Sequence, residues 1–498
     1  MKIEARIFEG RCPACSAELT ALKLPDTAFC PYCAKPLTEQ ATEPEIEPTI
    51  PKSTPATSEV APAPVCNPAD FMIDPEGVLQ KYKGASKRVA IPDWVTRIGE
   101  RAFSDCKWLT AVTIPGSVTS IGERAFSNCG GLTDIVIPDS VTSIGGNAFH
   151  RCSSLTTITI PTSVTSIGGC AFFGCKGLTA ITLPTMKTPL YTLFGDAVAA
   201  VPDSLKTVVV SGGTSICEKA FSDCKGLTAI TILDSVTSIG CAAFSSCWKL
   251  NSVTIPDSVT CIEGSAFQYC YSLTAIHIPD SVTSIGEYAF SHCARLAKVA
   301  IPNSVKSIER WTFNGCASLV SVAIPDSVTS IGWGAFENCR GLTSITIPDS
   351  VTSVDTCAFH GCIELTDITI PDSVTRIGGE AFSGCSNLTS ITIPDSVMRI
   401  GGETFAGCSS LTAITIPDSV TRIGKEAFAG CSGLTSIAIP ASVMGIEKNA
   451  FSNCSGLTTL HLPREAEKPK TKEMKAFAKM IKETFPNKKS PVRVYDLD

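Results

Sequence analysis

The apolar positions of this chain recur in units of 23 residues. In the unit at 132–152, apolar side chains occupy the first, fourth and sixth places, and polar or variable side chains lie between them. This alternation predicts a short strand over 132–137, with Leu132, Ile135 and Ile137 facing inward. Strands of successive units should then stack as a parallel sheet, at a spacing of about 4.8 Å per unit.

The second half of the unit predicts a return along another side. Pro138 ends the strand because it has no N–H, and Asp139–Ser140 is typical of a turn. Val141 and Ile144 should face the core again, and Gly145 is expected to permit the next bend. Each rung would thus carry its strand on one face and short strands, turns or 3-10 segments on the other.

Phenylalanine and cysteine close each unit. Fifteen Phe-x-x-Cys motifs run from Phe103 to Cys454, with one longer interval between Phe172 and Phe221. A single rung cannot bury its apolar side chains alone, so stacking is obligatory. The sequence therefore predicts a repeat solenoid of about sixteen rungs, a β-rich superhelix over 92–463.

The repeated L-T-x-I-T-I-P-D-S-V-T-x-I-G-x-x-A-F-x-x-C unit resembles the BspA-like leucine-rich repeat family. The resemblance covers roughly three quarters of the chain, and Pro, Gly, Phe and Cys recur together at fixed offsets. It implies a protein that binds proteins or matrix components, often on the surface of bacterial or protist cells.

Both ends of the solenoid depart from the repeat. Residues 69–91 are expected to cap its start. Residues 464–498 are Lys-rich, and apolar residues at helical spacing over 473–485 predict an amphipathic helix, followed by a short strand at 492–495. The helix is interpreted as a cap over the last rung, with binding to an anionic surface as the alternative.

One rung, at 184–206, has lost the repeat pattern, which predicts an inserted loop. Loops of repeat arrays often carry binding sites, yet an irregular rung can also be purely structural. Both interpretations stay open at the level of sequence.

The first 36 residues contain two C-P-x-C motifs. Cys12, Cys15, Cys30 and Cys33 can form the tetrahedral four-sulfur shell of a structural zinc ion, and 1–36 resembles a zinc ribbon. A redox C-x-x-C is the alternative. Residues 37–68 are rich in Pro, Thr and Glu, which predicts a disordered linker.

Composition and charge indicate which kind of partner and which cellular compartment to expect. Only 18% of residues are charged and the net charge is −6, which does not favour a nucleic-acid partner; a protein partner is expected. The sequence shows no membrane-spanning apolar run and no signal-peptide pattern, and its 25 cysteines are an odd number. These features favour reduced thiols and a cytoplasmic location, with the cell surface as the alternative.

The repeat cysteines are expected to be buried and inert. Six other cysteines lie outside both the Phe-x-x-Cys motifs and the predicted ribbon: Cys66, Cys170, Cys217, Cys241, Cys261 and Cys357. On the outward strand positions, a few charged or imidazole side chains interrupt the Thr, Ser and Ala residues and are the candidate partner-binding residues. They are Asp134, His277, Lys298, Asp367 and His461.

These observations predict a non-enzymatic scaffold for protein–protein interactions, with the zinc ribbon as a second interaction module. Neither a Ser/His/Asp order nor a phosphate-binding loop is present in the sequence. One alternative is a cell-surface adhesin exported without a recognisable signal. Another is a nucleic-acid-associated regulator that uses the ribbon and the basic helix, whose binding would be sensitive to salt.

The predicted ribbon leads to a first test. Cys30→Ser, or removal of zinc with a chelator, should unfold residues 1–36 because the metal supplies the folding energy of so small a module. The melting of the solenoid, followed by circular dichroism, should not change, since a linker separates the two parts. Loss of the solenoid transition in the variant would contradict this domain organisation.

Overall fold

The computed structural model describes residues 6–11, 18–24, 67–185, 187–195, 200–463 and 493–497. The chain divides into two units, Met1–Ala63 and Pro64–Asp498. In the first unit, strands β1 (Arg6–Arg11) and β2 (Glu18–Leu24) form an antiparallel pair. The four cysteines of the predicted zinc ribbon and the predicted helix at 473–485 lie outside the described residues.

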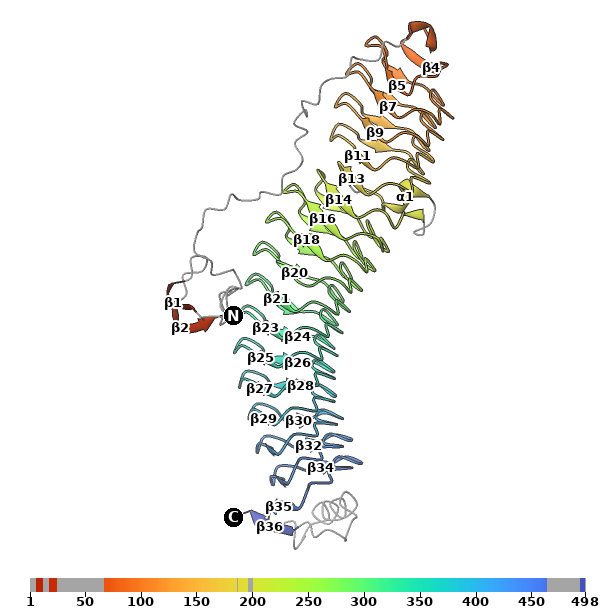
Figure 1. The fold of residues 1–498 in the computed structure, drawn as a ribbon. Helices are drawn as coiled ribbons and strands as arrows, with labels where there is room; N and C mark the ends of the chain where they lie inside the picture. Colours follow the sequence, from red (N-terminus) through yellow and green to blue (C-terminus); the bar gives the residue numbers. More distant parts are fainter. Residues whose placement is uncertain are drawn as a thin grey trace. The chain divides into compact units, whose positions relative to one another are not determined.

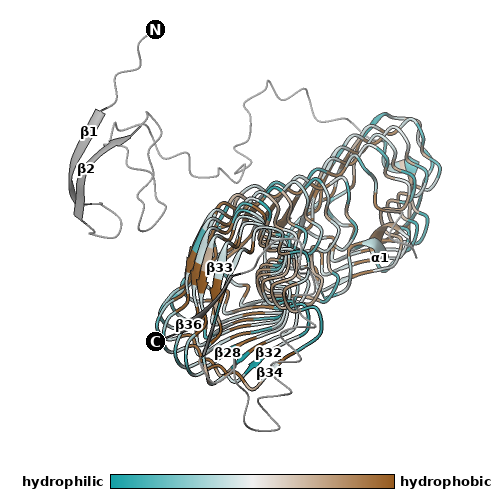
Figure 2. Cartoon of the chain, turned by 90° about the horizontal axis from the view of Figure 1, so that it is seen from below, coloured by the Kyte–Doolittle hydropathy of each residue, from teal (hydrophilic) through white to brown (hydrophobic). Residues whose placement is uncertain are grey.

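The second unit is a solenoid whose rungs follow one another in sequence order (Figure 1). Each rung has three sides, which we name the strand face, the short-strand face and the turn face. In the unit above, residues 143–144 make the short strand, and residues 145–153 make the turn face. Viewed along the stack, successive rungs nearly superpose (Figure 2).

The strand face consists of three- to five-residue strands that pair in parallel. They are β5 (Arg88–Ala90), β7 (Ala111–Thr113), β9 (Asp134–Val136), β11 (Thr157–Thr159), β13 (Ala180–Leu183), β14 (Thr207–Val210), β16 (Ala229–Ile232), β18 (Ser252–Thr254), β21 (Lys298–Ala300), β23 (Ser321–Ala323), β25 (Ser344–Thr346), β27 (Asp367–Thr369), β29 (Ser390–Thr392), β31 (Ala413–Thr415), β33 (Ser436–Ala438), β35 (Thr459–Pro463) and β36 (Arg493–Leu497).

The short-strand face consists mostly of two-residue strands in parallel ladders, and it begins with one antiparallel hairpin, β3–β4. Its strands are β3 (Phe71–Ile73), β4 (Val78–Tyr82), β6 (Arg97–Ile98), β8 (Ser120–Ile121), β10 (Ser143–Ile144), β12 (Ser166–Ile167), β15 (Ser215–Ile216), β17 (Ser238–Ile239), β19 (Cys261–Ile262), β20 (Ser284–Ile285), β22 (Ser307–Ile308), β24 (Ser330–Ile331), β26 (Ser353–Val354), β28 (Arg376–Ile377), β30 (Arg399–Ile400), β32 (Arg422–Ile423) and β34 (Gly445–Ile446).

The inward positions predicted from the repeat are confirmed. Leu132, Ile135 and Ile137 are buried, whereas Asp134 and Val136 on the same strand are exposed. The strand itself is shorter than the predicted 132–137: β9 covers only Asp134–Val136. Val141, Ile144, Phe149 and Cys152 are also buried, each at 0–1% exposure. About sixteen such rungs give one continuous core.

Stacked phenylalanine rings run through this core. The Phe149 ring lies 5.4 Å from that of Phe126 and 5.5 Å from that of Phe172, with interplanar angles of 4°. Offset stacking at this spacing is favourable for aromatic rings. Two continuous ring series result, from Phe103 to Phe194 and from Phe221 to Phe451, and within each series every ring packs against those of the adjacent rungs.

The turn face is held by hydrogen bonds between rungs, and its backbone differs from the sequence expectation. Gly145 does not have positive φ. Instead, a Cβ atom there would come within 2.5 Å of the Glu123 amide nitrogen, so the glycine permits close approach of two rungs. The left-handed positions are Asn147 and Arg151, with φ of 55° and 57°. Their N–H groups donate along the stack, to Gly169 and Phe173.

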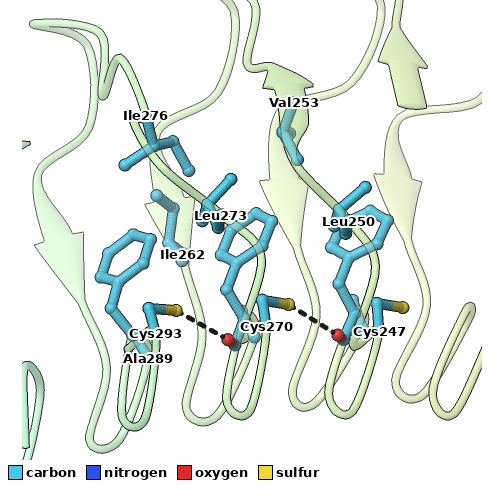
Figure 3. Packing of buried hydrophobic residues seen from close by; sticks show 14 of the residues in the cluster. Cys247, Leu250, Val253, Ile262, Cys270, Leu273, Ile276, Ala289 and Cys293 are labelled. Atoms are coloured by element: carbon cyan, nitrogen blue, oxygen red, sulfur yellow. Dashed lines mark hydrogen bonds between the residues drawn. The ribbon is translucent and has the colours of Figure 1, made fainter. Parts of the chain in front are cut away.

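The repeat cysteines are buried as predicted, and they also donate hydrogen bonds. Fourteen of the fifteen are buried, and Cys454 is half-buried. The Cys270 thiol donates to the Phe244 carbonyl, and the Cys293 thiol to the Phe267 carbonyl, both at 3.2 Å (Figure 3). A thiol fits here because it is apolar enough for the core and still offers a weak donor.

The irregular rung keeps the core filled. Its helix α1 (Tyr191–Phe194) buries Leu193 and Phe194, and the Phe194 ring lies 6.1 Å from that of Phe172. The N–H of Phe172 donates to Leu193, and that of Leu190 to Ala220, so the segment also continues the hydrogen bonds of the turn face. These contacts favour the structural interpretation of 184–206.

Both ends of the solenoid carry additional strands. At the start, the β3–β4 hairpin brings Tyr82 within 5.3 Å of both Phe71 and Phe103, measured between ring centroids. At the other end, β36 pairs in parallel with β35. The strand predicted at 492–495 is thus observed at Arg493–Leu497. At the opposite end, we infer that the β3–β4 hairpin shields the first rung from water.

The stacked rings lead to a test of the core. Phe336→Ala should lower the free energy of unfolding by about 3–5 kcal/mol, because it leaves a cavity between Phe313 and Phe359, each 5.5 Å away. Chemical denaturation measures the loss. Thr346→Ala, on an exposed strand position, should change stability by less than about 0.5 kcal/mol. Equal effects of the two changes would mean that the inward positions are misassigned.

The buried thiols lead to a prediction about pH. Burial raises the pKa of Cys316 from its ordinary 9.0 to about 12, and it raises the pKa of the other repeat cysteines as well. Unfolded thiols ionise above pH 9 while the folded ones stay protonated. Stability should therefore be insensitive to these groups below pH 9 and fall above it, by about 1.4 kcal/mol per pH unit for each buried thiol.

Urea denaturation at a series of pH values measures this slope. Cys270→Val removes one ionisable group and should make the decline shallower. If the urea concentration at the unfolding midpoint stayed constant as the pH rose above 9, the burial of the repeat cysteines would be contradicted.

Candidate functional site

Aromatic residues gather on the turn face of the central rungs. In the rungs near the C-terminal end, the positions two and four residues after the repeat phenylalanine hold small residues such as Gly384, Gly407 and Ser409. From Trp248 to Trp333, large rings occupy these positions or the second or third place before the phenylalanine, and we name them the aromatic strip. Its members are Trp248, Tyr269, Tyr271, Tyr288, His292, Trp311 and Trp333.

The first part of the strip is built on three neighbouring rungs. Trp248 and Tyr271 follow the repeat cysteine of their rungs, are 43% and 41% exposed, and lie 6.3 Å apart. The Tyr269 ring contacts Tyr271 at 6.0 Å and His292 at 5.0 Å. Lys225 Nζ lies 4.3 Å from the centroid of Trp248, a cation–π contact.

The second part is a stack of three rings. Tyr288 and Trp311 lie 4.9 Å apart at 19°, and Trp311 and Trp333 lie 5.1 Å apart. The guanidinium of Arg310 is 4.9 Å from one indole and 5.0 Å from the other. Trp311 Nε1 donates to Glu337 at 3.1 Å. These contacts fix the orientation of side chains that would otherwise rotate freely.

The two parts share one rung. Tyr288 and His292 lie four residues apart on it, so the rings form a series along the stack. From Trp248 to Trp333 the series spans roughly 18 Å at the spacing of parallel strands. Burial lowers the pKa of His292, so this imidazole is neutral at neutral pH. The strip is thus largely aromatic, with its two cations held over ring faces.

The candidate residues predicted on the strand face lie where the repeat placed them. Asp134, Lys298 and Asp367 are exposed on β9, β21 and β27, and His277 is exposed as well, whereas His461 on β35 is half-buried. A bridge between Ala275 and Lys298 puts His277 and Lys298 on neighbouring rungs.

The other three candidates are separated from this pair by several rungs. The predicted set is therefore not one cluster, and its role in binding stays a prediction.

A cavity of about 320 Å³ opens on the short-strand face, between β19, β20 and β22. It adjoins Glu263 and Glu309, which stand at the repeat position held by Gly145 in the unit described above. The ladder is continuous from β19 to β20 and is interrupted between β20 and β22. Glu263 accepts from the Cys241 N–H at 2.8 Å and Glu309 accepts from Ser307, so both carboxylates are engaged.

A serine–histidine pair on the turn face does not form a hydrolytic site. Ser291 Oγ lies 2.9 Å from Nδ1 of His292, but Ser291 is only 1% exposed. A nucleophile must reach its substrate, and this hydroxyl cannot. The pair fixes the ring of His292 within the aromatic strip.

Beyond Trp333, three possible metal donors approach one another: Cys357, His360 and Glu380. Burial, together with the charge of Glu380, raises the pKa of the Cys357 thiol to about 11, so it is not a ready nucleophile at neutral pH. From the sequence, Cys357 was placed only among the cysteines outside the repeat motif, and His360 was not singled out. The visible signal was His360 at a position that holds Ser383, Ala406 and Ala429 in the following rungs, three residues after a cysteine outside the motif.

The fold defines the class of this protein as a leucine-rich repeat solenoid. The family model for the BspA type leucine rich repeat region matches residues 81–195, 203–319, 307–431 and 376–490. The chain therefore belongs to the BspA-type leucine-rich repeat family. The proteins of this family are leucine-rich repeat proteins, which are generally non-enzymatic scaffolds.

One solved structure agrees with this assignment, and a second is similar in sequence. A leucine-rich repeat protein from Bacteroides ovatus is 28% identical, with a TM-score of 0.51; the match covers 87% of this chain and 97% of that one. A leucine rich cell surface protein from Faecalibacterium prausnitzii is 30% identical, with a TM-score of 0.35, and covers 82% of this chain and 94% of its own. No curated protein matches the chain.

Proposed function

We propose that this protein is a non-enzymatic scaffold that binds a protein partner through the aromatic strip. The observation that carries the proposal is the series of partly exposed rings from Trp248 to Trp333. Trp, Tyr and Arg are the residue types that contribute most to binding at protein interfaces. Three of the five tryptophans of the chain lie in this strip.

The rigidity of the turn face supports the same proposal. The backbone around Tyr269 and Trp311 is tied to the next rung by N–H groups that donate to Ser291 and Trp333, both at 2.8 Å. Rings held in this way lose little conformational freedom when a partner binds, so more of the contact energy appears as affinity.

The strip favours a protein over a nucleic acid. Its two cations, Lys225 and Arg310, lie over indole rings, and Glu337 adds a carboxylate beside Trp311. Binding to a phosphate backbone would require several free cations along one path. The net charge of −6 points the same way.

The N-terminal unit supplies a second proposed interaction module. In this proposal Cys12, Cys15, Cys30 and Cys33 hold a structural zinc ion, and the linker lets the ribbon contact a partner independently of the solenoid. The cysteines of the described residues are free thiols, which supports a reducing compartment. Within the described residues, no helix is long and apolar enough to span a bilayer.

For location, we keep the cytoplasm as the proposal and the cell surface as the alternative. The similarity to a surface protein of Faecalibacterium prausnitzii supports the alternative.

The strip can be tested by substitution. A partner is first identified by cross-linking and capture with the full-length protein, and its Kd is then measured by calorimetry. The combined change Trp248→Ala, Tyr271→Ala and Trp333→Ala should weaken binding at least about 30-fold, because each side chain removed is of the type that contributes about 2 kcal/mol at an interface.

Two controls keep the test specific. Val136→Ala removes an apolar side chain that is 71% exposed on the strand face and should leave the Kd unchanged. A variant with Ala at Asp134, Lys298 and Asp367 tests the strand face directly. Weakened binding in that variant, with no effect of the aromatic changes, would move the binding surface to the strand face and overturn the proposal.

A further inference from the structure

Cys357, His360 and Glu380 bring one sulfur, one nitrogen and one oxygen donor together on the turn face. Their ligating atoms all lie within 4.8 Å of one another. His360 Nδ1 is 3.8 Å from a carboxylate oxygen of Glu380. Each side chain is partly buried, so the donors are neither deep in the core nor dispersed in solvent.

The repeat backbone, rather than a loop, positions these donors. Cys357 and Glu380 occupy the same place in consecutive rungs, and both are left-handed, with φ of 55° and 57°. Their N–H groups donate to Gly379 and Gly402 at 3.0 and 2.9 Å. The N–H of His360 donates to the carbonyl of Cys357 at 3.0 Å, which closes a turn and keeps the imidazole near the thiol.

One donor atom in the cluster has no hydrogen bond. His360 Nδ1 is buried and lacks a hydrogen-bond partner, although the side chain as a whole is 35% exposed. A buried polar atom without a partner costs free energy. Nδ1 is also the ring nitrogen that lies nearest to the Glu380 carboxylate, so a cation between the two would satisfy both.

The donor set selects the metal. Thiolate, imidazole and carboxylate are the ligands that Zn²⁺ takes in proteins, at about 2.0–2.3 Å, which places tetrahedral ligands ~3.3–3.8 Å from one another. The distance between His360 and Glu380 already lies at the upper end of that range. Ca²⁺ and Mg²⁺ prefer all-oxygen shells and do not fit a site with sulfur and imidazole.

Neighbouring side chains form an outer shell. Trp333 and Glu337 lie near the thiol of Cys357, and the carboxylate of Glu337 adds negative charge there. Glu337 stands at the repeat position of His360, one rung earlier. Such outer groups orient metal ligands and raise the local affinity for a cation.

We propose that Cys357, His360 and Glu380 bind one Zn²⁺ ion, with a fourth coordination position left for water. Three protein ligands and one open position are typical of zinc sites that exchange their fourth ligand. The proposal goes beyond partner binding by the aromatic strip and does not depend on it. It also differs from the predicted four-cysteine site, because it uses the solenoid alone.

Metal binding by the full-length protein tests this proposal. The Cys30→Ser background removes a ligand of the predicted ribbon site. In that background, added Zn²⁺ should remain bound at about one ion per chain after desalting, measured by elemental analysis, and fall to near zero in Cys357→Ala and His360→Ala. Co²⁺ should give a thiolate-to-cobalt absorption band that Cys357→Ala abolishes and Glu380→Gln weakens or shifts.

Cys170→Ala is the matched control. Cys170 occupies the repeat position of Cys357, with φ of 57°, and is half-buried, but it belongs to no three-donor group among the described residues. Its loss should leave zinc content and the cobalt spectrum unchanged. Circular dichroism should show the same fold in all variants.

Equal zinc content and equal cobalt spectra in the Cys30→Ser background, with and without Cys357→Ala and His360→Ala, would overturn the site. An equal loss of zinc in Cys170→Ala would also overturn the proposal, because removing any thiol at this repeat position would then have the same effect.

Discussion

Contact between consecutive rungs is the constraint on which this structure depends. A rung such as 132–152 has no apolar partner within itself, so Phe149 becomes buried only when Phe126 and Phe172 stack on either side. The same neighbours receive the hydrogen bonds of the turn face and of the cysteine thiols. Each side chain of the repeat is therefore selected for what the next rung presents, and only secondarily for its own strand or turn.

Much of the solenoid could be predicted from sequence, because contact between rungs requires the same residue types at the same place in each 23-residue unit. The inward places of Leu132, Ile135 and Ile137 follow from alternation alone, and they are observed. The role of Gly145 was harder to predict, because a glycine can be required either by a left-handed backbone conformation or by the close approach of two rungs. A sequence does not separate the two causes. The structure shows close approach, with Asn147 and Arg151 as the left-handed residues.

The candidate sites were less predictable for a related reason. Charged residues such as Asp134 stand out on strands that are otherwise Thr and Ser, and these could be selected from the pattern. Trp248 and Tyr271 lie 23 residues apart, in a part of the unit that varies between rungs, so their adjacency depends on the turn-face geometry. The cluster of Cys357 and Glu380 likewise becomes visible only when consecutive rungs are superposed.

The identical backbone position of Cys357 and Glu380 in consecutive rungs has an evolutionary consequence. In such an array, gene segments are gained and lost as whole 23-residue units. Outside the central rungs, such an event would lengthen or shorten the molecule by about 4.8 Å and leave existing sites intact. Insertion of a unit between these two residues would instead separate the donors by a full rung. A site shared by two rungs thus fixes the order of its neighbours, while the rest of the array stays free to change in length.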